Sequence, residues 1–309
     1  MENPIRFVCH VRASRKKAVE AAATETLSLL RGLDPSRCPG GPLSERGGVF
    51  WIEVPGACAD RAVDRFARLG YTRAVDRLDA VDRVAAGGKG VVRWRKRYFR
   101  LARVYEEDAS LMRERAPDRR EFAVLGPGGT PRTVKGYRGD GTRAGCRALP
   151  VCDARLLVNM VRPAVTGRAR FLDPFAGAGG VAIEALASGF GVCTLDVDPV
   201  VSPGLRRQGA WHGVADAGRL PFADSSFDAI ATEPPYHRDL GPAFASALGD
   251  MDRVLAPGGK AAVLCADWHV EILTSRSVAL GLPAVFEAPV DRKGTACRLF
   301  VWEKPGRSG

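Results

Sequence analysis

Long apolar runs and an export signal are both missing from this sequence of 309 residues. No uninterrupted apolar stretch approaches the roughly 20 residues that a membrane-spanning helix needs. The first residues, Met1 to Arg6, lack the charged and then apolar pattern that directs export. These absences predict a cytoplasmic protein without a membrane partner.

Metal-ligand spacing is missing as well. The 8 cysteines and 4 histidines are scattered along the chain, with no Cys-x-x-Cys pair and no histidines nearby to complete a set of ligands. In a reducing compartment, cysteines of this kind are free thiols, either buried or incidental. We therefore expect no metal, and the sequence specifies no oligomeric state.

Acidic residues are outnumbered, and the excess positive charge is unevenly distributed. The formal net charge is +11. Along the sequence, the net charge is +3 for residues 1–84, +9 for residues 85–149 and −1 for residues 150–309. The basic middle segment suits a polyanion such as RNA, because phosphates provide sequence-independent affinity. The alternative is a solvated basic surface in a chain that is rich in arginine throughout.

A glycine-rich loop is the most informative feature that is present. Residues 171–180 form an apolar run that ends in Asp173 and continues into glycines, and residues 181–188 have a helical pattern. Gly177 and Gly179 have no side chains, so the backbone can turn sharply and a ligand can approach the amides at the start of the helix. Asp173 falls at the carboxyl end of the strand, where open α/β sheets bind ligands. This pattern predicts a cofactor-binding loop.

Two further predicted strands also end in carboxylates. Residues 191–198 end in Asp196 and Asp198, and a carboxylate there can accept hydrogen bonds from both ribose hydroxyls of a nucleoside. Asp216 ends the next candidate strand, where it can accept a hydrogen bond from an adenine amino group. We therefore expect a nucleoside-like ligand.

A fourth predicted strand, residues 227–232, leads into the turn Glu233-Pro-Pro-Tyr236. Together with the loop, Asp196 and Asp216, this turn resembles the motifs of class I S-adenosylmethionine-dependent methyltransferases, in the branch that methylates amino nitrogens. Within that branch the sequence is most similar to the tRNA guanine-N2 methyltransferases. The similarity extends over residues 135–303 and includes a helix before the glycine loop.

The resemblance implies a fold, a cofactor and two sets of site residues. The fold is α/β, with a Rossmann-like seven-stranded sheet whose last strand is antiparallel, and the cofactor is S-adenosyl-L-methionine. The residues that would hold the cofactor are Asp173, Phe175, Gly177, Gly179, Asp196, Asp198 and Asp216. The residues that would form the catalytic turn are Glu233, Pro234, Pro235 and Tyr236.

The chemistry of the turn follows from the weakness of an exocyclic base amine as a nucleophile. Its lone pair is delocalised into the ring, and acceptors for its two hydrogens turn that lone pair toward the sulfonium methyl group. Glu233 would supply a side-chain oxygen and Pro234 a backbone carbonyl, which the two prolines hold in place. Tyr236 would stack on the base.

Glu233 itself departs from the family pattern, which usually has Asp, Asn or Ser at this position. One extra methylene moves the acceptor oxygen by roughly 1.5 Å. Three interpretations follow: a pocket shifted to suit a different amine, a slow or inactive methyltransferase, or a turn adjusted around the standard substrate.

Three segments are expected along the chain. Residues 1–84 have a β-α-β-β-α-β pattern that predicts a small ferredoxin-like α+β domain, if one weak strand lies in the loop at 34–48. Residues 85–148 are a basic linker and a candidate RNA-binding segment, because cations and aromatics interleave in residues 91–105. The alternative for 91–105 is that the aromatics enter a core while the arginines face water. Residues 149–309 form the methyltransferase domain.

The leading hypothesis is an N-methyltransferase that acts on the N2 amine of a guanine in tRNA. The middle segment is too short for the complete THUMP domain that the tRNA enzymes usually carry, which leaves a DNA adenine-N6 or cytosine-N4 methyltransferase as an alternative. A third hypothesis, from another class, is a nucleic-acid-binding protein that keeps the cofactor fold without turnover. A small-molecule or protein N-methyltransferase would leave the basic segment unexplained.

Overall fold

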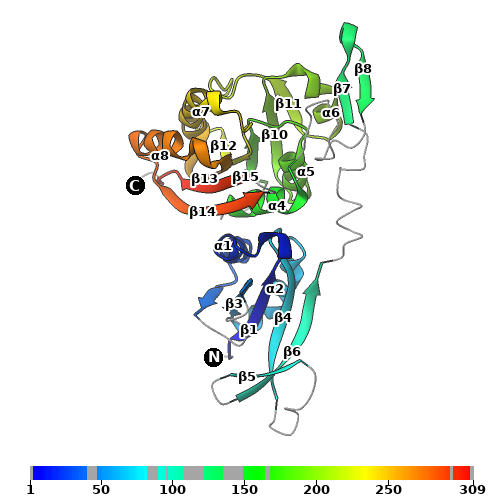
Figure 1. The fold of residues 1–309 in the computed structure, drawn as a ribbon, viewed down its shortest axis with the longest axis vertical. Helices are drawn as coiled ribbons and strands as arrows, with labels where there is room; N and C mark the ends of the chain where they lie inside the picture. The colour runs from blue at the N-terminus through cyan, green and yellow to red at the C-terminus, as the bar shows by residue number, and fades with distance from the viewer. Residues whose placement is uncertain are drawn as a thin grey trace. The chain divides into compact units, whose positions relative to one another are not determined.

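The computed structural model divides into two compact units, Met1–Ala109 and Ser110–Gly309, each built around its own sheet (Figure 1). Among the described residues, no helix is both long and apolar enough to cross a membrane. The structure describes residues 3–39, 47–81, 90–94, 97–107, 122–134, 149–163, 168–292 and 295–306.

The first unit confirms the ferredoxin-like prediction. Its first four strands lie in the order β2-β3-β1-β4, all neighbours are antiparallel, and β2 is the weak strand expected in the loop. Its elements are β1 (Ile5–Val11), α1 (Val19–Leu29), β2 (Ser36–Cys38), β3 (Val49–Val54), α2 (Ala59–Phe66), β4 (Thr72–Val81), β5 (Val91–Trp94) and β6 (Arg97–Glu106).

Strands β5 and β6 extend this first sheet beyond β4, although their residues were expected to form part of a linker (Figure 1, cyan). Strand β6 pairs with β4 over nearly its whole length. The reason is alternation: Phe99 is buried in a cluster with Trp51, while Arg97 and Arg100 are exposed. Here an aromatic enters a core and arginines face water. The remainder of the expected linker, at 108–121 and 135–148, lies outside the described residues.

The second unit confirms the Rossmann-like methyltransferase sheet. The strand order is β11-β10-β9-β12-β13-β15-β14, and β15 alone runs antiparallel to its neighbours. Its elements are β7 (Phe122–Leu125), β8 (Pro131–Val134), α4 (Val151–Met160), β9 (Arg170–Asp173), α5 (Gly180–Ala187), β10 (Gly191–Asp196), α6 (Ser202–Arg207), β11 (Trp211–Val214), β12 (Phe227–Thr232), α7 (Gly241–Val254), β13 (Leu255–Ala266), α8 (Val270–Ala279), β14 (Ala284–Arg292) and β15 (Thr295–Glu303).

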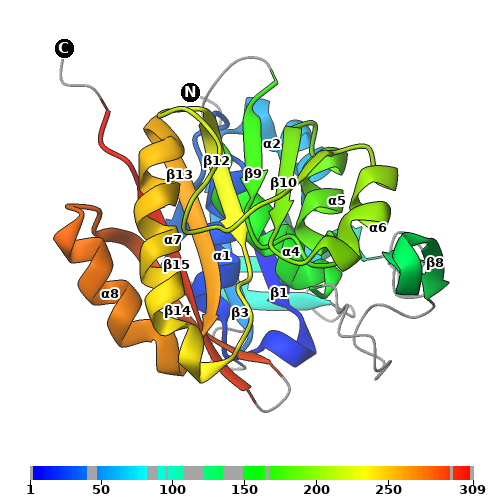
Figure 2. The same cartoon turned by 90° about the horizontal axis from the view of Figure 1, so that it is seen from above.

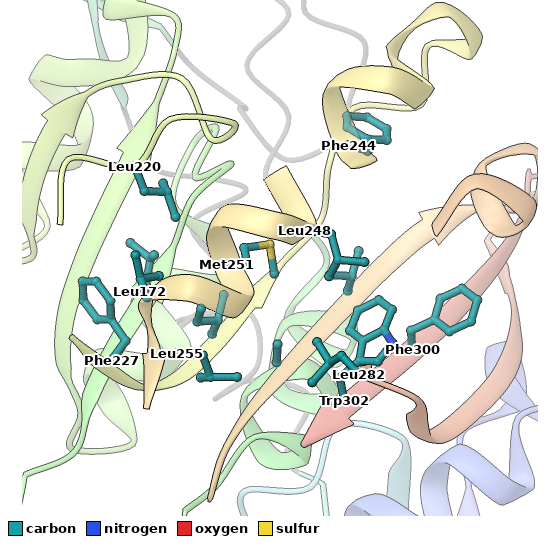
Figure 3. Packing of buried hydrophobic residues seen from close by; sticks show 14 of the residues in the cluster. Leu172, Leu220, Phe227, Phe244, Leu248, Met251, Leu255, Leu282, Phe300 and Trp302 are labelled. Carbon is teal, nitrogen blue, oxygen red and sulfur yellow. The ribbon is translucent and has the colours of Figure 1, made fainter. Parts of the chain in front are cut away.

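Helices cover both faces of this second sheet. Helix α4 packs with α5 and helix α7 with α8, and Figure 2 shows α5 and α7 on different sides of the strands. Buried residues Phe244, Leu248 and Met251 recur at helical spacing along α7 and face the sheet (Figure 3). On β15, Phe300 and Trp302 stack at 5.3 Å between ring centroids. This core fixes the central strands, whose carboxyl ends carry the candidate site.

Candidate active site

The glycine loop has a backbone that only glycine adopts without strain. Gly177 has φ +51° and Gly179 has φ +80°, both in the left-handed region. A Cβ added to Gly179 would lie 2.1 Å from Oε1 of Gln208, whose amide nitrogen donates to the carbonyl of Ala178 at 2.9 Å. The loop is therefore held from α6 and leads directly into α5.

A hairpin formed by β7 and β8 supports the same loop. Phe122 of β7 is buried in one apolar cluster with Ala176 and Ala178 of the loop and Leu205 of α6. A Cβ added to Gly204 would lie 2.1 Å from the Phe122 ring, so the hairpin and helix approach closely because this position is glycine. Sequence reasoning missed this support, since nothing local relates Phe122 to the loop.

Asp173 is buried at the carboxyl end of β9, with 1% of its surface exposed. Thr232, at the end of the neighbouring strand β12, donates a hydrogen bond from Oγ1 to Oδ1 of Asp173 at 2.7 Å. Burial raises the pKa of Asp173 to about 7, although the hydrogen bond from Thr232 acts in the opposite direction. A cation bound nearby would favour the carboxylate form.

Asp196 joins the second strand end to the glycine loop. Its Oδ2 accepts a hydrogen bond from the amide of Gly177 at 2.7 Å, and its Oδ1 accepts one from the amide of Asp198 at 2.9 Å. Each carboxylate oxygen retains a lone pair for a ligand hydroxyl. Asp198 is exposed and caps the next turn through the amide of Val200.

Asp216 is exposed and follows β11, and its Oδ1 accepts a hydrogen bond from the amide of Gly218 at 2.8 Å. Because β9, β10 and β11 are parallel neighbours, Asp173, Asp196 and Asp216 lie along one edge of the sheet. Their roles as cofactor ligands stay predictions.

A row of aromatic side chains connects the glycine loop to the proline turn. Phe175 packs edge-on against Phe244 at 5.7 Å, and Phe244 packs edge-on against His269 at 4.6 Å. The Nε2 of buried His269 lies 2.9 Å from the carbonyl oxygen of His237, directly after the turn. The carbonyl can only accept, so Nε2 donates. This contact fixes the end of the turn. The sequence analysis assigned no role to His269.

The turn after β12 places Glu233 and Tyr236 in direct contact. Tyr236 donates its hydroxyl hydrogen to Oε1 of Glu233, and Pro234 is buried while Pro235 is exposed. Burial raises the pKa of Tyr236, and the contact with Cys297 raises it further, so the phenol stays neutral. The hydroxyl is therefore a fixed donor to the carboxylate.

Two further residues that the sequence analysis missed complete this group. Nη1 of Arg292, near the end of β14, donates to Oε1 of Glu233 and to the Tyr236 hydroxyl oxygen at 2.6 Å. Nε of Arg292 lies 3.3 Å from Oδ2 of Asp153 on α4. These contacts join segments that are distant in sequence, and local patterns do not relate such segments to one another.

Comparisons with known proteins relate the central residues of the second unit to methyltransferases. A family model described as "Methyltransferase domain" matches residues 172–263. The tRNA (guanine(10)-N2)-dimethyltransferase of Pyrococcus abyssi is 36% identical over 98 residues, which are 29% of this chain and 29% of the relative. Demethylmenaquinone methyltransferase of Beutenbergia cavernae is 41% identical over 96 residues, 30% of this chain and 39% of the relative. The chain thus spans well under half the length of these relatives.

The fold similarity extends further than the sequence similarity. The crystal structure of TrmN from Thermus thermophilus matches 97% of this chain and 99% of that one, with a TM-score of 0.53 at 16% identity. At that identity the likeness shows the fold alone.

The loop also suits a cationic nucleoside cofactor. Asp173 is a buried carboxyl group that a bound cation would ionise, and Asp196 retains acceptor capacity beside the loop amides. Among the described residues no cluster of three His, Cys, Asp or Glu residues resembles a metal site. The match to the methyltransferase domain family indicates S-adenosyl-L-methionine as the cofactor. The second unit therefore has the fold of a class I S-adenosylmethionine-dependent methyltransferase, and its central residues are similar to those of the tRNA guanine-N2 methyltransferases.

Proposed function

We propose that this enzyme methylates an amino nitrogen of an RNA base, namely the N2 amine of a guanine in tRNA. The observation that supports this most strongly is the Glu233 turn, which places a carboxylate directly after β12, where the backbone carbonyl of Pro234 would be the second acceptor. The similarity to tRNA (guanine(10)-N2)-dimethyltransferases over 98 residues supports the same acceptor.

The residues of the turn would act by positioning and electrostatics. The amine attacks the methyl carbon, the carbon–nitrogen bond forms as the carbon–sulfur bond breaks, and the electron pair of the broken bond stays on sulfur. Positive charge then develops on the amine nitrogen, where the carboxylate of Glu233 stabilises it. The extra proton leaves the nitrogen for this carboxylate or for water. No covalent enzyme intermediate is required.

The basic middle segment would provide affinity for RNA. Residues 85–149 carry a net charge of +9, and the described part of this segment exposes Arg97 and Arg100 on β6. Exposed arginines neutralise phosphates and release counterions, so this contribution should weaken as salt concentration rises. The role of this segment in RNA binding is part of the proposal.

A second candidate acceptor is a small molecule, because the same central residues resemble a demethylmenaquinone methyltransferase at 41% identity. The glycine loop and the strand ends belong to cofactor binding, which every acceptor shares. The Glu-Pro-Pro-Tyr turn is the part that bears on the acceptor, and its two hydrogen-bond acceptors suit an amine.

The test is methyl transfer from isotopically labelled S-adenosylmethionine to unmodified total tRNA, ribosomal RNA and duplex DNA. We expect label in tRNA with the wild type and a loss of at least about 100-fold with Glu233→Ala. Glu287→Ala is the matched control, because Glu287 is an exposed glutamate that pairs with Arg298 at 2.9 Å on the hairpin of β14 and β15. Label only in DNA would support the DNA methyltransferase. No label in any nucleic acid, with cofactor binding intact, would refute the proposed function.

A further inference from the structure

Glu233 of the Glu-Pro-Pro-Tyr turn forms an ion pair to which the proposed function assigns no role. Nη1 of Arg292 contacts the same oxygen of Glu233 that accepts the Tyr236 hydroxyl hydrogen. We propose that Arg292 is a positioning residue that clamps Glu233, so that a glutamate does the work of the usual shorter side chain. This inference rests on the proposed function, because it assigns Glu233 to the acceptor amine.

Arg292 is itself held in place by a buried carboxylate. Asp153 on α4 has a fully buried side chain, and its Oδ2 lies 3.3 Å from Nε of Arg292. The guanidinium therefore bridges two carboxylates through different nitrogens, Nε toward Asp153 and Nη1 toward Glu233. If Arg292 moved away from Glu233, its ion pair with the buried side chain of Asp153 would have to break as well. The bridging arginine is consequently a fixed part of the site.

The arrangement also distinguishes the two oxygens of Glu233. Both donors, the Tyr236 hydroxyl and Nη1 of Arg292, meet Oε1, which uses the two lone pairs of that oxygen. We assign Oε2 to one hydrogen of the acceptor amine, which leaves the other for the backbone carbonyl of Pro234. Because these two contacts fix Oε1, they also fix the orientation of the longer Glu233 side chain, and Oε2 takes a defined position.

Charge supports the same assignment. Asp153 and Glu233 carry two negative charges and Arg292 one positive charge, so the ionised group has a net charge of −1 before methyl transfer. A negative group suits an acceptor nitrogen that becomes positive in the transition state. The arginine therefore reduces the repulsion between two carboxylates and leaves the net sign that the reaction needs.

The opposite role for Arg292 would be a latch. A guanidinium and the N–C–N edge of guanine both present N–H donors, so Arg292 would occupy the place of the base and would have to leave before the base binds. Its second contact, to buried Asp153, argues against such a movement. The clamp and the latch make opposite predictions for the removal of Arg292.

The test compares steady-state kinetics on tRNA for the wild type, Arg292→Gln and Arg292→Lys. Loss of a charge-assisted contact to Glu233 should lower kcat about 10-fold to 100-fold in Arg292→Gln, while KM for tRNA and cofactor affinity change less than about 3-fold. Arg292→Lys keeps the charge without the planar fork and should fall between the two. Arg298→Gln is the matched control, since Arg298 lies on the same hairpin, pairs with Glu287 of β14 and with Asp267 after β13, and should retain wild-type rates.

A double-mutant cycle with Glu233→Gln separates a clamp from general structural support. If Arg292 acts through Glu233, Arg292→Gln should reduce kcat less than about 2-fold further in the Glu233→Gln background. The same cycle can be measured as denaturant midpoints of unfolding, which needs no acceptor. It therefore tests the contact between Arg292 and Glu233 even if the wild type methylates no tRNA. Absence of tRNA methylation would count against the proposed function alone. The clamp would be refuted if the two substitutions had additive effects on the denaturant midpoint or on kcat, or if Arg292→Gln raised kcat/KM.

Discussion

Asp173→Asn tests the electrostatics of the cofactor loop without changing the shape of the side chain. Asp173 is 1% exposed, and burial raises its pKa to about 7 from an ordinary value near 3.8. The hydrogen bond from Thr232 to Oδ1 can form equally well to an asparagine amide oxygen. The variant therefore removes the ionisation and keeps the hydrogen bond.

The sign follows from the direction of the shift. The pKa is higher in the folded than in the unfolded protein, so the folded protein binds an extra proton between about pH 4 and pH 7. The resulting stabilisation is fully present below about pH 4 and is lost as the pH rises through 7. A full shift corresponds to about 4 kcal/mol in the free energy of unfolding, of which about 3 kcal/mol falls between pH 5 and pH 8.

The assay is denaturant unfolding of the cofactor-free protein at pH 5, 6, 7 and 8. We expect the stability of the wild type relative to Asp173→Asn to decrease by about 3 kcal/mol over this range. Asp228→Asn is the control, because a hydrogen bond from Arg170 lowers the pKa of Asp228 and its ionisation lies below pH 5. Its difference from the wild type should be constant from pH 5 to pH 8. A constant difference for Asp173→Asn as well would refute the reasoning.

Two further predictions concern the support of the loop. Gly179→Ala should weaken S-adenosylmethionine binding at least 10-fold in a calorimetric titration, because the added Cβ would displace the Gln208 amide that donates to the carbonyl of Ala178. Gly189→Ala is the control: Gly189 has φ +89° and open space around it, so this variant should cost about 1 kcal/mol of stability and leave affinity unchanged. Phe122→Ala should lower the free energy of unfolding of the second unit by about 3 to 5 kcal/mol and weaken cofactor binding, because the Phe122 ring packs with Ala176 and Ala178 of the loop. Phe66→Ala, in the core of the first unit, should lower stability without changing cofactor affinity, and equal effects of both phenylalanine variants on affinity would contradict this account.

Local patterns predicted the central strands of the second unit. A helix precedes the glycine loop and a strand leads into the Glu233 turn, as expected, and the positive φ angles of Gly177 and Gly179 agree with a sharp glycine turn. These features depend on residues that are close in sequence, where apolar periodicity and glycine carry the information. The same is true of the ferredoxin-like pattern in the first unit.

Contacts between distant residues were not predictable from the same patterns. Arg292 reaches Glu233 and Asp153 from another strand, and periodicity does not show which charges meet. The pairing of β6 with β4 was missed for a related reason, since an interleaved run of arginines and aromatics fits both an RNA-binding segment and a half-exposed strand. Long-range pairing with β4 shows the strand, and the role of its exposed arginines in RNA binding stays a proposal.

The most direct test of the central claim is methylation of one tRNA transcribed either with guanosine or with inosine in its place. Inosine lacks only the N2 amino group of guanosine, so the comparison isolates the proposed acceptor atom. We predict labelled N2-methylguanosine in the guanosine transcript and no label in the inosine transcript, with comparable binding of both RNAs. Equal labelling of the two transcripts, or label on another nucleoside, would contradict the assignment to the guanine N2 amine.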